Sequence, residues 1–155
     1  MHRVMLFLIA HNIRSLYNVG SMFRNADAFG VNHLYLTGYT GVPPRPEIAK
    51  VSLGAEETIP WSHTRDPLEV IERLRSDDVR VLAFESDPSF VPLTQFTVEP
   101  SVSYAVLVGN EPEGLDASLM AHATERMFIP MHGIKSSLNV AVASGIALYH
   151  LTLRR

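Results

Sequence analysis

The sequence predicts an α/β protein with a mostly parallel sheet flanked by helices. Apolar runs of strand length alternate along the 155 residues with stretches that place apolar side chains at helical spacing. Prolines and glycines stand at most of the boundaries between these segments. No internal repeat, linker or low-complexity segment interrupts the alternation, which is typical of strands joined by crossover helices in one sheet.

The first part of the chain contains one clear helical pattern and one long loop. Residues 21–29 carry apolar side chains at helical spacing and are followed by Gly30, a common helix terminator. Residues 38–55 hold three prolines and three glycines, which predicts a loop with one helical turn at residues 47–51. The strands expected around them are residues 4–10, 31–37 and 58–61.

The second part opens with a strong helix start. Asp66 is suited to cap a helix, Pro67 to its first position and Glu69 to its third, so a helix is expected from there to about Arg75. Residues 87–100 hold three prolines and predict a loop. The remaining expected elements are strands at residues 79–84, 104–108 and 126–129 and helices at residues 116–123 and 140–151.

The last helix, expected to begin at Ser136 and Ser137, is apolar nearly all round. Such a helix cannot lie on a solvated surface, so either the domain buries it completely or a second subunit covers its outer face. We expect a homodimer through this helix, with Ala141 and Leu148 on the outward side.

Composition narrows the class of protein. A chain of 155 residues is most simply one domain, and the absence of cysteine excludes disulfides and thiolate metal sites and favours a cytoplasmic home. The seven histidines show no metal-binding spacing, so no metal is expected, and no apolar run is long enough to span a membrane. The net charge of −3 argues against a strongly basic nucleic-acid-binding domain.

Three stretches suggest chemistry beyond packing. In the first, Asn18 to Ser21 resemble a turn and helix cap, and Arg24 lies one helical turn beyond Gly20, so backbone amides and a guanidinium could face one anion. The second, residues 107–115, is a strand that runs into a loop with two glycines and two carboxylates, without the signature of a phosphate or dinucleotide loop. The third, residues 129–139, joins a strand end to a helix start, where ligands of open α/β sheets usually bind. Taken singly, each stretch is more simply explained by ordinary caps and turns.

Together, the three stretches closely resemble the motifs of the SpoU/TrmH family of RNA ribose 2′-O-methyltransferases, in the SPOUT superfamily. An N-x-G-x-x-x-R pattern, a strand ending in G-N-E before G-L, and an I-P-M strand end before S-L-N-V occur in the family's order. An intervening element with Lys50, Gly54, Ala55 and Glu56 extends the resemblance over nearly the whole chain. The motifs appear here as residues 18–24, 106–111 with 114–115, and 129–131 with 137–140.

The resemblance implies a single SPOUT-type domain over residues 1–155, with a C-terminal trefoil knot, dimerisation through that segment and no appended RNA-binding domain. It also implies that S-adenosyl-L-methionine is the cofactor and is held in the knot. Apolar walls and backbone donors suit its adenine ring. The implied cofactor-binding residues are Phe84, Leu107, Gly109, Ile129, Met131, Ser137 and Leu138.

The resemblance further implies a catalytic set that aligns a ribose 2′-hydroxyl of tRNA or rRNA with the methyl group. Arg24 is the family's catalytic arginine, and because a guanidinium is almost never neutral, we expect it to bind phosphate and stabilise the developing alkoxide rather than act as a base. Asn18 and Asn139 are expected to orient these groups, and Ser137 to contribute to the helix start. Glu111 is expected to stabilise the loops or Arg24, with a role as base as the alternative.

RNA would have to be bound by the domain itself. Its expected contacts are Arg14, Arg24, Arg45, Lys50 and Lys135. Two other functions stay open at this stage: a non-catalytic RNA- or nucleotide-binding module of the same fold, and a flavodoxin-like phosphate-binding domain. The joint presence of the five expected catalytic residues speaks against a degenerate copy.

Overall fold

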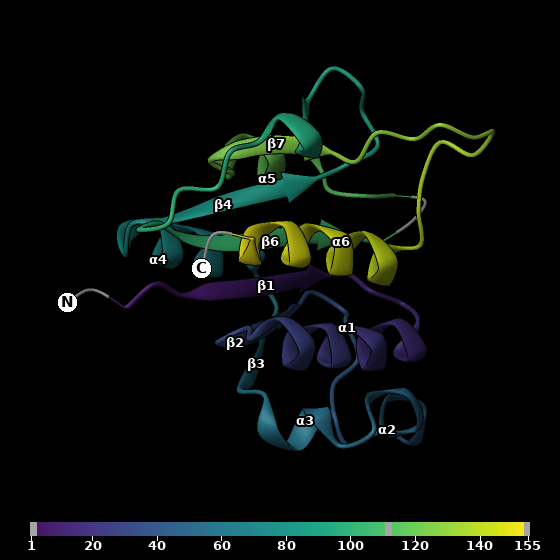
Figure 1. The fold of residues 1–155 in the computed structure, drawn as a ribbon. Coiled ribbons are helices and arrows are strands. Elements are labelled where there is room, and N and C mark those ends of the chain that lie inside the picture. The colour runs from purple at the N-terminus through teal and green to yellow at the C-terminus, as the bar shows by residue number, and fades with distance from the viewer. Residues whose placement is uncertain (1–2, 111–112, 154–155) are drawn as a thin grey trace.

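The computed structural model describes residues 3–110 and 113–153, which form one seven-stranded sheet (Figure 1). The strand order is β3-β2-β1-β6-β4-β7-β5, and neighbouring strands are parallel throughout. The carboxyl ends of the strands therefore lie at one edge of the sheet. The strands are β1 (Leu6–His11), β2 (His33–Thr37), β3 (Trp61–Thr64), β4 (Val79–Phe84), β5 (Val91–Pro92), β6 (Ser103–Gly109) and β7 (Glu125–Phe128).

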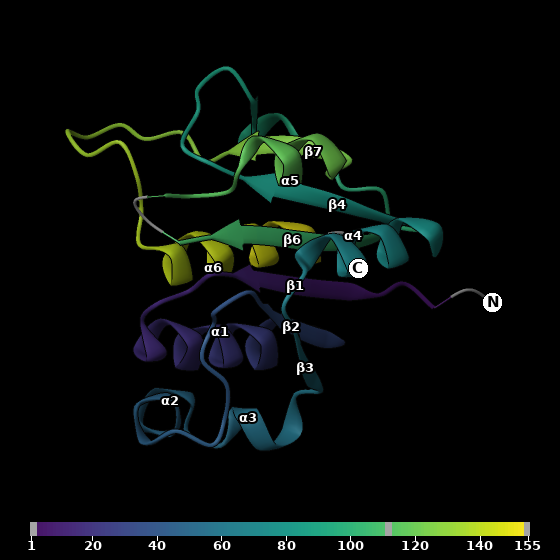
Figure 2. The same cartoon turned by 180° about the vertical axis from the view of Figure 1, so that it is seen from behind.

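Helices cover both faces of this sheet. Figures 1 and 2 show α1 and α6 on one face, α4 and α5 on the other, and α2 and α3 beside α1 near β3. Side chains alternate along each strand, so Leu6 and Leu8 of β1 join the core under α1 and α6, whereas Phe7 and Ile9 join the core under α4 and α5. The helices are α1 (Leu16–Phe29), α2 (Pro46–Ser52), α3 (Ala55–Thr58), α4 (Pro67–Ser76), α5 (Ala117–His122) and α6 (Val140–Thr152).

Most of the predicted elements are confirmed. Gly30 ends α1 in the left-handed conformation, with φ of 68°, and Asp66 caps α4 by accepting a hydrogen bond from the Leu68 amide. The expected turn at residues 47–51 is a full helix, α2. The predicted loop at residues 87–100 also contains the short edge strand β5 and a 3-10 turn at Leu93–Gln95.

Helix α1 begins at Leu16 rather than at Ser21. The hydroxyl of Ser15 accepts a hydrogen bond from the Asn18 amide and caps the helix, so Asn18 lies inside α1 and not in a turn before it. Gly20 is needed for packing: a Cβ at this position would lie 2.6 Å from the carbonyl oxygen of Ile48 in α2. Gly20 therefore permits a close approach between two helices.

The predicted strand at residues 58–61 is wrong. Residues through Thr58 form α3, and β3 begins only at Trp61. Pro60 has no amide hydrogen to donate to a sheet, although its carbonyl accepts a hydrogen bond from Leu34 at 2.9 Å. The ladder with β2 therefore runs from Trp61 to Thr64.

Helix α6 differs from prediction in its cap and in its outward face. Asn139, not the serine pair, caps the helix by accepting hydrogen bonds from the amides of Ala141 and Val142. Ala141 and Leu148 point inward and are buried in the core, so the expectation that they face outward is wrong. The outward side chains are Val142, Ile146 and Tyr149, which are 51%, 39% and 56% exposed. No helix in residues 3–110 and 113–153 is both long and apolar enough to cross a membrane.

Candidate functional site

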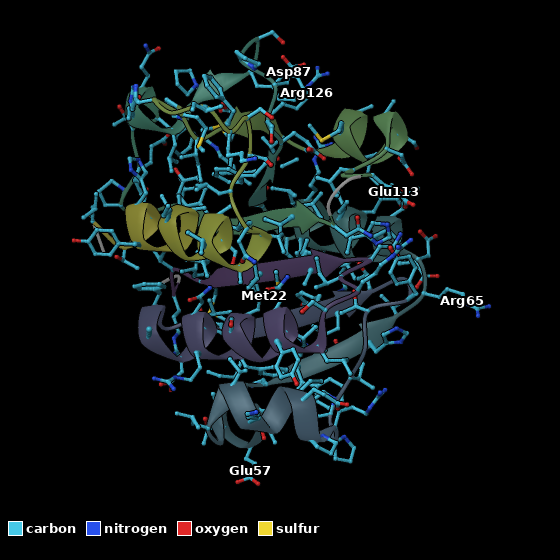
Figure 3. The ribbon with its side chains drawn as sticks, turned by 90° about the vertical axis from the view of Figure 1, so that its right-hand side faces the viewer. Met22, Glu57, Arg65, Asp87, Glu113 and Arg126 are labelled. Atoms are coloured by element: carbon cyan, nitrogen blue, oxygen red, sulfur yellow. The ribbon has the colours of Figure 1, made fainter. Side chains whose placement is uncertain are left out.

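A cavity of about 730 Å³ lies at the carboxyl edge of the sheet, within the size range of small-molecule sites. Its walls come from the ends of β4, β6 and β7, from the segment after β7, and from the first turn of α6. Figure 3 looks onto this edge, with Glu113 beside the loop after β6 and with Asp87 and Arg126 above it. In parallel α/β proteins this is the edge at which ligands bind.

Six of the seven residues expected to bind a cofactor line this cavity. Leu107 does not, because strand alternation turns its side chain into the core under α4 and α5, while its neighbour Val108 faces the cavity. A contact between the Leu107 side chain and a ligand in this cavity is therefore not expected, and cofactor binding by Leu107 stays a prediction. The six residues that line the cavity are Phe84, Gly109, Ile129, Met131, Ser137 and Leu138.

The loop after β6 is closed by backbone contacts that leave little room for side chains. A Cβ at Gly109 would lie 2.9 Å from the backbone of Gly114, and the Gly114 amide donates to the carbonyl of Asn110 at 2.6 Å. The carboxylate of Glu85, at the end of β4, accepts a hydrogen bond from the Leu115 amide. Glu85 also lines the cavity, so a carboxylate stands in its wall.

Asn110 is the most deeply buried polar side chain in the cavity wall, with 4% of its surface exposed. Its amide nitrogen donates a hydrogen bond to the hydroxyl of Tyr39. Its Oδ1 atom is buried and has no hydrogen-bond partner among residues 3–110 and 113–153. A buried acceptor without a hydrogen bond lowers the stability of the protein, and a ligand that supplies a donor would remove this penalty.

The first and third motifs meet between α1 and α6. The side-chain amide of Asn139 donates to Oδ1 of Asn18 at 3.2 Å, although the two residues are 121 positions apart. Asn25 strengthens this junction by donating to the carbonyl of Ala141 at 2.8 Å and to Ser144 at 3.2 Å. Gly145 faces Asn25 with little space between them, since a Cβ there would lie 3.3 Å from the amide. The small residues of α6 were the only sequence signal for this contact.

The other expected catalytic residues are placed less tightly. Arg24 is exposed on α1, and its side chain forms no hydrogen bond or ion pair with any residue in the described part of the chain. Ser137 is half-buried in the cavity wall. Glu111 lies outside the described residues.

The five residues expected to contact RNA do not form one patch. Lys135 lines the cavity, and Arg14 lies near it, with its guanidinium 3.6 Å from the Glu113 carboxylate. Lys50 is exposed on α2, and Arg45 lines a second cavity of about 550 Å³ beside Trp61. Helix α2 lies on the far side of α1 from α6 (Figure 1).

His11, at the end of β1, is a partly buried titratable group at this edge. Burial lowers the pKa of His11 from 6.5, and the charges of Asp116 and Asp66 act in the opposite direction. Its Nδ1 atom lies 3.0 Å from the Thr37 hydroxyl, which holds the ring in place. Within residues 3–110 and 113–153, no group of three or more histidine or acidic side chains could hold a metal ion.

The fold and the site define a parallel α/β protein with a cavity at the carboxyl edge and a pair of asparagines between α1 and α6. The sequence model of the SpoU rRNA Methylase family matches residues 5–149, so the chain belongs to this family. The predicted family and fold class are confirmed.

Two known relatives are similar to this chain over most of its length. The chain is 28% identical over 154 residues to the 23S rRNA (guanosine-2'-O-)-methyltransferase RlmB of Vibrio vulnificus, covering 99% of this chain and 61% of the relative. It is 32% identical over 136 residues to the 23S rRNA (guanosine(2553)-2'-O)-methyltransferase RlmP of Bacillus subtilis, covering 86% of this chain and 52% of the relative. The chain thus spans about three-fifths and about half of these relatives.

A solved structure has a fold similar to that of this chain. The AdoMet-bound rRNA methyltransferase from Sinorhizobium meliloti superposes with a TM-score of 0.88 at 28% identity. The match covers 97% of this chain and 56% of that one.

Proposed function

We propose that this protein transfers a methyl group from S-adenosyl-L-methionine to a ribose 2′-hydroxyl of rRNA or tRNA. One observation carries the proposal: the second and third motifs form one cavity, and the first motif is joined to it by the bond between Asn18 and Asn139. The names of RlmB and RlmP, which describe 2′-O-methylation of guanosines in 23S rRNA, support this class of reaction.

The residues around the cavity fit the proposed cofactor. Phe84, Ile129 and Leu138 offer apolar surface for an adenine ring, and the glycine loop after β6 exposes backbone groups. The unpaired Oδ1 of Asn110 supplies an acceptor for one of the cofactor's donors. Gly109, Met131 and Ser137 complete the set of residues that we expect to hold it.

The bound cofactor supplies a methyl group that is already activated by its sulfonium. The protein must then orient the ribose hydroxyl and stabilise the charge that develops as its proton leaves. Arg24 is exposed, and a guanidinium group is almost never neutral, so it suits the binding of a phosphate and of the developing alkoxide rather than proton removal. Asn18 and Asn139 orient these groups through their shared hydrogen bond, and Ser137 stands at the cavity wall beside them. Glu111 is proposed to stabilise the neighbouring loops or Arg24, and its alternative role is that of the base.

Arg14 and Lys135, near the cavity, are the proposed phosphate contacts closest to the chemistry. Arg45 and Lys50 would bind RNA farther along the surface, beyond α1. Such contacts act mainly through charge, so RNA affinity should fall as the salt concentration rises. A cytoplasmic location, where rRNA and tRNA are found, is part of the same proposal, as is the trefoil knot around residues 129–139.

The proposal is tested with two measurements on the purified protein. Calorimetry should show binding of S-adenosylmethionine, and labelled methyl groups should appear at ribose 2′ positions of total RNA from a strain that lacks the gene. Cofactor binding without transfer to any RNA would instead support the non-catalytic module. Absence of cofactor binding would contradict the cavity assignment itself.

We further propose that the protein is a homodimer through the outward face of α6. Val142, Ile146 and Tyr149 leave an apolar strip exposed, and the ring of Tyr149 packs against Phe29 of α1 with 5.9 Å between centroids. A second copy of the same strip would bury it in a self-complementary contact.

Ile146→Glu should dissociate the dimer, because an unpaired carboxylate buried in an apolar interface costs several kcal/mol, about 3–5 or more. Val91→Glu is the matched control, since Val91 is 38% exposed, close to the 39% of Ile146, but lies on the edge strand β5. Sedimentation velocity should show a monomer only for the α6 variant. A folded wild-type monomer at micromolar concentration would contradict the proposed dimer.

A further inference from the structure

Tyr39 is an exposed aromatic ring attached to the wall of the cavity. It follows β2, and half of its surface, 50%, is accessible to solvent. Its hydroxyl accepts a hydrogen bond from the side-chain amide of Asn110, which lines the cavity. The ring is therefore held beside the ligand site while much of its surface remains open.

The backbone beneath Tyr39 is fixed by polar contacts between the ends of β1 and β2. The amide of Tyr39 donates to Oδ1 of Asn12 at 3.0 Å, and Asn12 itself has a φ of 53°. Gly38 also has a positive φ, and a Cβ there would lie 1.9 Å from Oδ1 of Asn12. The hydroxyl of Thr40, which is buried, donates to the carbonyl of Ala10 and accepts from the amide of Ile13, both at 3.0 Å. The exposure of Tyr39 is thus a property of an ordered loop.

A cation lies over the same ring. The guanidinium carbon of Arg14 is 6.0 Å from the ring centroid of Tyr39. The interaction with Tyr39, and secondarily the charge of Glu113, raises the pKa of Arg14 above its ordinary value. Arg14 is exposed and only loosely paired with Glu113, labelled in Figure 3, so its charge remains available to a ligand. An open aromatic surface with an adjacent guanidinium matches a nucleobase and the phosphate attached to it.

Asn110 connects Tyr39 to the proposed cofactor site. Its amide nitrogen is used by Tyr39, but its buried Oδ1 has no partner in the described part of the chain. A side chain placed only to support Tyr39 would more economically be one without a second polar atom. The pair therefore connects an exposed ring to a buried acceptor in the cavity wall.

We propose that Tyr39 is the stacking platform for an unpaired nucleobase of the RNA substrate, next to the ribose that is methylated, with Arg14 contacting a phosphate. This inference rests on the proposed methyl transfer to RNA. It adds that the RNA bound at the site is single-stranded. Bases that are splayed out of a helix are the usual targets of aromatic side chains in RNA recognition.

The test uses the full chain and a short single-stranded RNA that carries the fluorescent base 2-aminopurine. Stacking on Tyr39 should quench its fluorescence, and Tyr39→Leu should abolish most of the quenching and weaken RNA binding about tenfold. Tyr39→Phe keeps the ring but loses the bond to Asn110, so it should retain most of the quenching. The matched control is Tyr17→Leu, since Tyr17 is 51% exposed on α1 and should leave quenching unchanged.

The measurements distinguish this inference from the proposed function. Tyr39→Leu and Tyr39→Phe both lose the hydrogen bond to Asn110, so calorimetry should show the same cofactor affinity for the two variants, whereas only Tyr39→Leu should raise the KM for RNA in methyl transfer. Wild-type methyl transfer with no quenching, or equal loss of quenching in Tyr17→Leu, overturns the platform and leaves the methyltransferase proposal intact. Quenching that requires Tyr39, in a protein that transfers no methyl group, would support the platform and contradict the catalytic proposal.

Discussion

Two sets of loops meet at the carboxyl edge of the sheet, and they are built differently. The loops after β1 and β2 are held together by the side chains of Asn12 and Thr40, which satisfy backbone groups of both. The segment 131–138 after β7, in contrast, forms no hydrogen bond with any other residue in the described ranges, and Ile134 is fully exposed. One side of the site is preformed, while the other is open.

The difference suggests a division of labour within the proposed reaction. A preformed surface loses little conformational entropy on binding, which suits the recognition of RNA by Tyr39 and Arg14. An open segment can close around a small cofactor, and its ordering is then part of cofactor binding. Changes on the two sides should therefore have separable effects.

The largest expected effect is that of Arg24→Ala, on the preformed side. Loss of one preorganised electrostatic group should lower the rate of methyl transfer about a hundredfold or more, while the affinity for S-adenosylmethionine hardly changes. Arg24→Lys should restore little activity, because the ammonium lacks the planar fork of the guanidinium. Single-turnover transfer and calorimetry measure the two quantities.

Arg65→Ala is the control for this prediction, since Arg65 is also exposed but points away from the molecule in Figure 3. It should leave the transfer rate within about a factor of two of the wild type. An Arg24→Ala protein with wild-type activity would show that this arginine is an exposed helix residue without a role in catalysis.

Paired glycine substitutions compare the stability of the two sides directly. Gly38→Ala combines a positive φ with a clash against Asn12 and should lower the free energy of unfolding by about 1–3 kcal/mol. Gly133→Ala meets nothing within 4 Å and should change it by no more than about 0.5 kcal/mol. Urea denaturation of both variants measures these changes in the free energy of unfolding. Equal destabilisation would contradict the proposed difference between the two sides of the site.

Hydrogen exchange should sharpen the comparison further. Saturating S-adenosylmethionine is expected to slow amide exchange in residues 131–138 about tenfold or more, because the segment gains contacts only when the ligand is bound. Residues 37–41 should be protected already and change little. Equal protection of both segments without cofactor would rule out an open cofactor side.

The smallest expected effect is a dependence of stability on pH through His11. Burial lowers its pKa below 6.5, so the unfolded chain takes up a proton first as the pH falls. The stabilising effect of the neutral ring is complete above about pH 6.5 and is lost as the pH falls from there toward the lower pKa of the folded state.

His11→Gln should therefore reduce the loss of unfolding free energy between pH 7.5 and pH 5.5, as measured by denaturation. Part of the slope will remain in this variant, because burial and Arg73 lower the pKa of His33 as well. An unchanged slope would contradict the assignment to His11.

Sequence patterns predicted what depends on local chemistry. Asp66 and Gly30 marked helix ends correctly because caps act on their own backbone neighbours. The outward face of α6 was mistaken because both of its sides are apolar, so periodicity cannot tell which one the sheet covers. Leu107 was placed in the cavity for a similar reason, since both it and Val108 are buried, on opposite faces of β6.

Contacts between distant residues left no such pattern. Tyr39 and Asn110 are 71 positions apart, and nothing in either neighbourhood indicates that they share a hydrogen bond. The role of Asn25 could not be predicted either. The small residues of α6 leave room for its side chain, but this can be recognised only when α1 is known to pack against α6. The motifs located the site, whereas its walls depended on the packing of α1 and α6.

The hydrogen bonds between α1 and α6 also have a kinetic consequence. Asn18 and Asn139 are separated by 121 positions, and Asn25 and Ser144 by 119, so their contact requires almost the whole chain to be in place. Contacts that close such long loops form slowly, after local helices and hairpins. During refolding, the ability to bind cofactor should therefore return with the slowest kinetic phase, well after the helices have formed. Cofactor binding would then indicate that folding is complete.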